Sequence, residues 1–88
     1  MKIKPQYSVL CDDDGLSLME RLPDGTVREA APLSATAGMA IEGFMRGLSR
    51  DALIDAIVGE FDGADRDTVS ADLDALAAQL IALGYAEE

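Results

Sequence analysis

Histidine and tryptophan are absent from this sequence, and cysteine occurs once, at Cys11. The commonest general base and the commonest metal ligand are therefore missing. A single cysteine allows neither an intramolecular disulfide nor a thiolate cluster. Serine and cysteine side chains have no imidazole that could activate them as nucleophiles. The sequence therefore predicts a protein that is not an enzyme, and we expect neither a bound metal nor a cofactor.

Long apolar segments are also missing. No apolar run approaches the roughly 20 residues that a helix needs to span a bilayer. Lys2 and Lys4 are not followed by the apolar segment of a signal peptide. A length of 88 residues suits one folded unit, and a hydrophobic content of 49% with few aromatic residues predicts an aliphatic core. We therefore expect a single cytoplasmic domain covering residues 1–88.

Basic residues are scarce, with 7 Lys and Arg against 17 Asp and Glu, for a formal net charge of −10. A field of this sign repels phosphate backbones and favours solubility or a cationic partner. A helix–turn–helix that reads DNA is excluded on the same ground. Its reading helix would be Asp65–Leu83, whose first ten residues hold four aspartates and one arginine. We therefore expect no nucleic-acid partner.

The first third of the chain predicts three strands. Apolar and polar residues alternate in Tyr7–Cys11, which ends at an acidic turn before the segment Leu16–Leu22. Pro23-Asp24-Gly25 follows, and these residue types suit the three positions of a three-residue hairpin loop. The third strand is expected at Thr26–Ala31. The pattern predicts an antiparallel sheet with consecutive strands as neighbours.

The hairpin loop also predicts a register for the second and third strands. Glu20 should face Arg28, an opposite-charge pair that contributes about 0.2–1 kcal/mol. The N–H groups that bond back to the second strand then alternate with N–H groups that point to the outside. The other expected pairs are Leu22 with Thr26 and Leu18 with Ala30, and the outward N–H groups are those of Val27, Glu29 and Ala31.

Helical periodicity begins at residue 35. Ser34 is a good N-cap for a helix over Ala35–Met45, and Ser49 is a good N-cap for a second helix that ends near Phe61. Asp65 or Asp67 is expected to cap a third helix. Its apolar residues recur at steps of four and three, and Gly84 suits the position after its end. These apolar residues are Val69, Leu73, Leu76, Leu80 and Leu83.

Two further segments resemble known motifs but lack residues that those motifs require. If Gly15 is aligned with the glycine of a calcium-binding loop, Leu10 and Arg21 stand where carboxylates are needed. An acyl carrier protein needs a serine in an Asp-Ser-Leu setting at a helix start. Ser49 opens a helix but lies between Leu48 and Arg50. Calcium binding and acyl carriage are therefore both excluded.

Three segments in this order resemble the PqqD-like family of recognition elements for ribosomally made, modified peptides. Leu33-Ser34-Ala35-Thr36-Ala37 is similar to the family's entry into its first helix, and Leu48–Phe61 is similar to its short second helix. Asp72 within the spaced leucines, closing on Gly84-Tyr85, is similar to its C-terminal pattern. The resemblance extends over essentially the whole chain.

The resemblance implies an α+β, winged-helix-like fold, with a three-stranded antiparallel sheet followed by three helices. It also implies a non-catalytic adaptor that binds the leader of a precursor peptide and presents it to a modifying enzyme, such as a radical SAM enzyme or a leader peptidase. The leader would add as a strand to the third strand and contact the third helix. The implied leader-binding residues are Thr26, Val27, Arg28, Glu29, Ala30, Ala31, Asp72, Ala75, Leu76 and Gln79.

An alternative remains open from the sequence. An acidic winged-helix protein could instead mediate other protein contacts or regulation. A gene for a precursor peptide and one for a modifying enzyme beside this gene would distinguish the two hypotheses.

Overall fold

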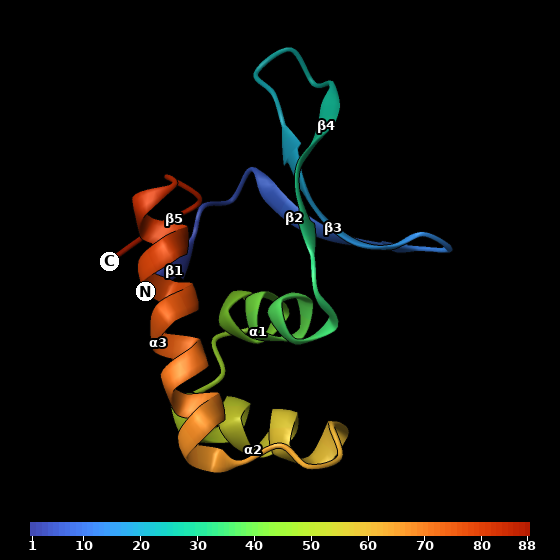
Figure 1. Ribbon diagram of the computed structural model, residues 1–88. Helices are drawn as coiled ribbons and strands as arrows, with labels where there is room; N and C mark the ends of the chain where they lie inside the picture. Colours follow the sequence, from blue (N-terminus) through green and yellow to red (C-terminus); the bar gives the residue numbers. More distant parts are fainter.

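The computed structural model describes residues 1–88 and contains a three-stranded antiparallel sheet followed by three helices, as the sequence predicts. In Figure 1, α1 lies between the sheet and α2, and α3 runs along one side of both helices. The sheet consists of β2 (Tyr7–Asp12), β3 (Gly15–Arg21) and β4 (Val27–Leu33). The helices are α1 (Ala35–Met45), α2 (Arg50–Glu60) and α3 (Arg66–Ala82).

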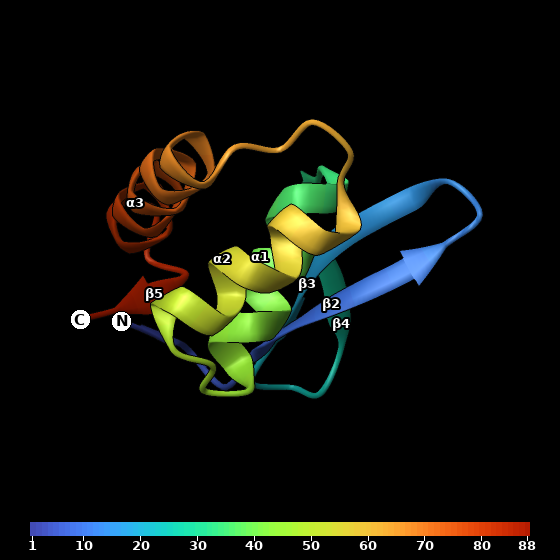
Figure 2. The same cartoon turned by 90° about the horizontal axis from the view of Figure 1, so that it is seen from below.

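A second, very short sheet joins the two ends of the chain. β1 (Lys2–Ile3) pairs antiparallel with β5 (Ala86–Glu87), and Figure 2 shows the termini side by side next to α3. Buried Ile3 and Ala86 lie opposite each other in this pair. Two-residue strands leave no periodicity in a sequence, which is why this sheet was not predicted.

Both hairpins of the main sheet form where the turn residues predict them. Asp12 pairs with Gly15 around a two-residue loop, and Gly15 has φ +127°. In the second hairpin, the Leu22 N–H donates to the Thr26 carbonyl at 2.8 Å, and Gly25 has φ +90°. Hydrogen bonds from Thr26 to the Asp24 carboxylate hold the pKa of that group below its ordinary value. The loop at residues 23–25 is thus stabilised by its own side chains.

The predicted register of β3 and β4 is correct near the loop and wrong beyond it. Glu20 does pair with Arg28, and their side chains form an ion pair at 2.9 Å. The register shifts between Leu18 and Met19, however, so that Leu18 pairs with Ala31 and not with Ala30. Ala30 is the extra residue of a β-bulge. The strand also ends later than predicted, at Leu33, and Thr26 belongs to the loop.

The helix ends follow the expected capping chemistry. The Ser34 and Ser49 side chains each accept a hydrogen bond from the backbone N–H three residues later. Asp65, not Asp67, caps α3 and accepts from Thr68. At the other end of α3, Gly84 has φ +83° and the Tyr85 N–H donates to the Leu80 carbonyl at 2.9 Å. This arrangement turns the chain back along α3.

The core consists of two aliphatic clusters that share partly buried residues. One lies between the sheet, α1 and the C-terminal half of α3, and the other lies between the three helices. Phe44 and Leu76 pack against both clusters and join them. The first cluster contains Ile3, Tyr7, Leu18, Ile41, Leu80 and Ala86, and the second contains Ala40, Leu53, Ile54, Ile57, Val69 and Leu73.

The buried Tyr7 makes stability depend on pH in the alkaline range. Burial raises the pKa of the Tyr7 phenol, and the nearby Glu20 carboxylate, which accepts its hydrogen bond at 3.2 Å, raises it further. The folded state therefore favours the protonated phenol, whose stabilisation is complete below the unfolded pKa of about 10 and is lost as pH rises through the folded value. We expect Tyr7→Phe to unfold less steeply with rising alkaline pH than the wild type in denaturation series. Equal slopes for the two proteins would contradict this account.

Candidate functional site

The outer edge of β4 is open. The strand order is β2-β3-β4, so β4 has a neighbour on one side only. Since the Leu22 N–H bonds across to Thr26, alternation along the ladder directs the N–H groups of Val27 and Glu29 to the open side. The bulge turns the predicted third outward donor, Ala31, toward Leu18 instead. At the next outward position stands Pro32, which has no N–H to offer.

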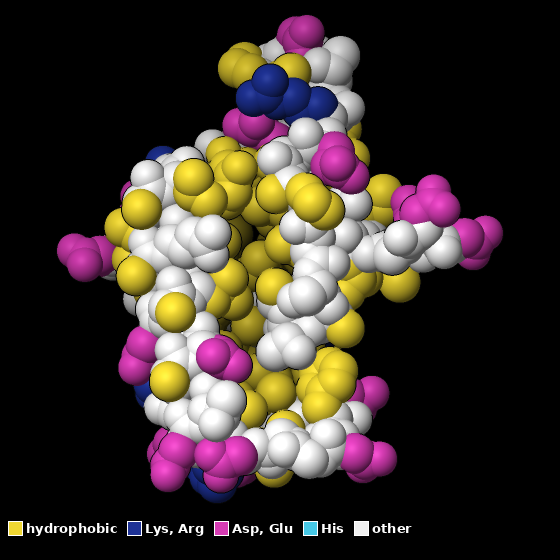
Figure 3. Space-filling model, viewed as in Figure 1, with side chains coloured by type: hydrophobic (Ala, Val, Ile, Leu, Met, Phe, Trp, Pro, Cys, Tyr) yellow, Lys and Arg dark blue, Asp and Glu magenta, His cyan; other side chains and the backbone are white.

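An apolar cleft lies between the end of β4 and the C-terminal half of α3. Figure 3 shows apolar side chains gathered in a hollow between α3 and the segment that runs from β4 into α1. The cavity at this position encloses about 150 Å³. Eight of its 11 lining residues are hydrophobic, so it suits the apolar side chains of a bound segment. The lining residues are Leu18, Ala31, Pro32, Leu33, Ser34, Ala37, Leu76, Gln79, Leu80, Leu83 and Tyr85.

The residues implied by the resemblance on the strand side lie mainly along the open edge. Thr26 is in the loop, where its side chain bonds to Asp24. Val27, the first residue of β4, is 58% exposed. The Glu29 carboxylate accepts a hydrogen bond from the Ser17 hydroxyl at 2.8 Å. Arg28 is held by Glu20, and Ala30 and Ala31 are partly buried, with Ala31 lining the cleft.

The residues implied on α3 do not all face the same cavity. Leu76 and Gln79 line the cleft beside β4. Asp72 lines a different cavity nearer the start of α3. Ala75 is exposed and lines neither of them. The four residues share one face of α3, at steps of three and four, but they are spread along the helix, so that face passes from the one cavity to the other.

Sequence reasoning missed Tyr85 and Leu83 as parts of the cleft. The turn at Gly84 brings Tyr85 back toward the sheet, where its hydroxyl lies 3.5 Å from the Ala30 carbonyl. Its ring packs edge-on against Tyr7, with the ring centroids 5.1 Å apart. Leu83 is 57% exposed, more than the core-facing leucines of the same helix. The sequence signal for Tyr85 was Gly84, which predicts that the chain turns back after α3, and no sequence signal distinguished Leu83 from the core-facing leucines.

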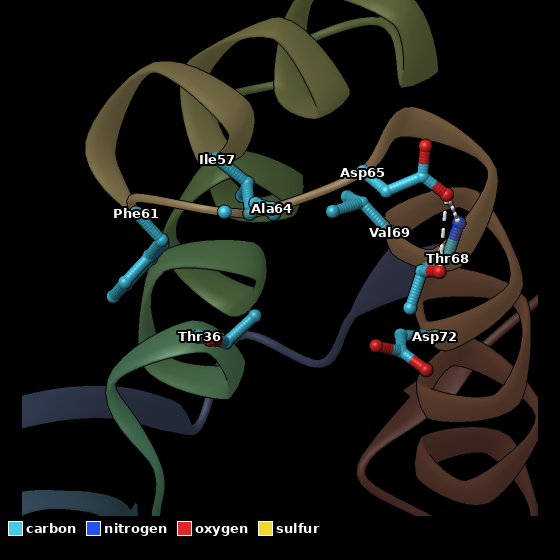
Figure 4. A pocket seen from close by; sticks show the side chains of 9 residues that line it. Thr36, Ile57, Phe61, Ala64, Asp65, Thr68, Val69 and Asp72 are labelled. Carbon is cyan, nitrogen blue, oxygen red and sulfur yellow. Dashed lines mark hydrogen bonds between the residues drawn. The ribbon is translucent and has the colours of Figure 1, made fainter.

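A second cavity of about 190 Å³ lies where the three helices approach one another. Its apolar lining comes from α2, α3 and the segment between them, and its polar lining comes from the start of α1 and the first turns of α3 (Figure 4). It is lined by Thr36, Ile57, Phe61, Gly63, Ala64, Asp65, Thr68, Val69 and Asp72.

Neither cavity brings together a set of ligands for a metal ion. No group of three or more His, Cys, Asp or Glu residues is arranged to hold a metal ion. Every buried side-chain nitrogen and oxygen has a hydrogen-bond partner. None of the helices combines the length and the apolar character that crossing a membrane requires. The arrangement offers a strand edge and apolar surface, which are means of binding a peptide.

Two solved structures share this architecture over nearly the whole chain. TbiB1 in complex with the TbiA(β) leader peptide has a TM-score of 0.73 and 28% sequence identity, covering 99% of this chain and 95% of that chain. Lasso peptide synthetase B1 complexed with the leader peptide has a TM-score of 0.74 and 23% identity, covering 99% and 96%. No family model matches the sequence, and no curated protein does.

Proposed function

We propose that this chain, which has the fold of the PqqD-like recognition elements, is a non-catalytic adaptor that binds the leader of a ribosomally made precursor peptide. One observation carries the proposal. An open strand edge lies beside an apolar cleft in a chain similar to TbiB1, which was solved with a leader peptide. The whole of residues 1–88 acts as one binding domain in this proposal.

The leader adds to β4 as a further strand. The outward N–H groups of Val27 and Glu29 then bond to leader carbonyls, and β4 carbonyls accept from leader N–H groups. An added strand satisfies edge groups that would otherwise remain open to unwanted pairing. Apolar leader side chains enter the cleft against Leu76 and Leu83. Backbone bonds thus supply affinity, and the cleft supplies selectivity.

The proposed contacts lie on the β4 side and on α3, where Leu76 and Gln79 line the cleft and Asp72 and Ala75 lie outside it. On β4 and its loop they involve residues 26–31, and on α3 they involve Asp72, Ala75, Leu76 and Gln79. We add Leu83 and Tyr85 to this set, because both line the cleft. No metal or cofactor takes part. The partner that acts on the bound precursor is a separate modifying enzyme, such as a radical SAM enzyme or a leader peptidase, in the cytoplasm where precursors are made.

A leader titration tests the proposal. The probes are fluorescently labelled synthetic leaders, namely the TbiA(β) leader and the leader of any precursor peptide whose gene is found beside this one. We expect a dissociation constant in the micromolar range or below, about −8 kcal/mol or stronger. With a net charge of −10, association with a basic leader should slow as salt rises. If the neighbouring leader does not bind and another protein does, the chain is instead a protein-interaction module.

A further inference from the structure

The second cavity opens beside the cleft that the leader is proposed to occupy. At the start of α1, Thr36 lines the second cavity and its neighbour Ala37 lines the cleft. On α3, Asp72 lines the second cavity and Leu76 lines the cleft. Four helical residues correspond to a rise of about 6 Å. A peptide that lies in the cleft can therefore reach the second cavity with one long side chain.

The second cavity combines an apolar floor with a polar rim. Ile57, Phe61 and Val69 supply apolar surface, and the volume of about 190 Å³ is several times that of a water molecule. Figure 4 shows the Asp72 carboxylate pointing across the opening toward Thr36. No lysine or arginine lines the cavity. Its charge and shape thus suit a side chain that is apolar along its length and positive at its end.

Asp72 is the carboxylate available to such a side chain. Asp65, the other acid at the cavity, already accepts two hydrogen bonds from Thr68 as the cap of α3. The ion pairs of the molecule use Glu20, Asp74 and Asp55. Asp72 takes part in none of these pairs, is exposed, and lies beside apolar surface. A cation placed here would lose little hydration and gain a direct partner.

We infer that the second cavity binds an arginine side chain of the peptide that occupies the cleft. The methylene stem of arginine lies on Val69 and Ile57, as long cationic side chains do on apolar surface. The planar guanidinium pairs with the Asp72 carboxylate through two parallel hydrogen bonds. The inference rests on the proposed function for the source of the arginine, and the binding of the side chain itself can be tested without a leader.

N-acetyl-arginine amide is the probe, and N-acetyl-citrulline amide is its neutral match in shape. Both are titrated into the full-length protein labelled with ¹⁵N, and amide shifts are followed by NMR. The arginine compound should shift the amides of Thr36, Thr68 and Asp72 at concentrations where the citrulline compound does not. Asp72→Asn should weaken the arginine response roughly two- to fivefold, as expected for a partly exposed ion pair. Asp67→Asn removes the same charge from the same helix away from the cavity and should leave the response unchanged.

Three results would overturn the inference. They are equal responses to the two compounds, shifts spread evenly over the acidic surface, and an unchanged response in folded Asp72→Asn. A parallel titration with the labelled leader keeps this outcome separate from the proposed function. If the leader binds but the arginine probe does not, the cavity assignment fails and the adaptor role stands. If the leader does not bind and the arginine probe does, the adaptor role fails and the side-chain site stands.

Discussion

Glu29→Pro should leave the protein folded and weaken leader binding, whereas Arg28→Pro should destabilise the sheet itself. The Glu29 N–H points to the open edge, so proline there removes a donor that only an added strand would use. The Arg28 N–H lies on the side of β3, in the pair with Glu20. Proline at position 28 deletes that ladder bond and the ion pair at 2.9 Å. We expect a loss of about 1–3 kcal/mol in unfolding free energy for the unmet bond alone.

The binding effect in Glu29→Pro is expected to be at least about 1 kcal/mol, or roughly fivefold in the dissociation constant. Glu29→Ala is the matched control, because it removes the carboxylate that bonds to Ser17 but keeps the backbone N–H. Circular dichroism melting and leader titration on the three variants measure both effects. Unchanged leader affinity in a folded Glu29→Pro variant would show that the leader docks elsewhere.

Leu18→Ala should cost about 2–5 kcal/mol of unfolding free energy, because Leu18 is 1% exposed at the centre of the first core cluster. A domain of 88 residues has a total stability of about 4–13 kcal/mol, so the variant should be partly unfolded at the lower end of that range. Leu18 also lines the cleft, and the cavity left behind would enlarge it. Denaturant titration followed by circular dichroism gives the loss.

Leu18→Met is the control for volume, and it should cost less than about 1.5 kcal/mol. A loss below about 1 kcal/mol in Leu18→Ala would mean that the neighbours close over the space. In that case the sheet and the C-terminal half of α3 would be less rigidly packed than the buried cluster around Leu18 indicates.

Local chemistry made much of the fold predictable from the sequence. Ser34 and Ser49 are caps in the structure because a serine side chain reaches the N–H three residues later whatever the rest of the chain does. The loop at residues 23–25 forms for a similar reason, and it places Glu20 opposite Arg28. These interactions span a few residues, so the residue types suffice to predict them. The resemblance to the PqqD-like family added the order of the elements.

The site depended on contacts that no local pattern contains. The bulge at Ala30 shifts the register so that Leu18 pairs with Ala31, and this reverses the predicted direction of the Ala31 N–H. Asp72, Ala75 and Leu76 share one face of α3, and how α3 packs on the other elements decides that Asp72 lines the second cavity, Leu76 lines the cleft and Ala75 lines neither. Tyr85 joins the cleft through the turn at Gly84 and its contact with Tyr7, which lies far away in the sequence. The sequence by itself thus determined the strands, caps and loops, because their energies are local. Only the tertiary structure decided which faces meet and which donors remain open, because those depend on packing between distant segments.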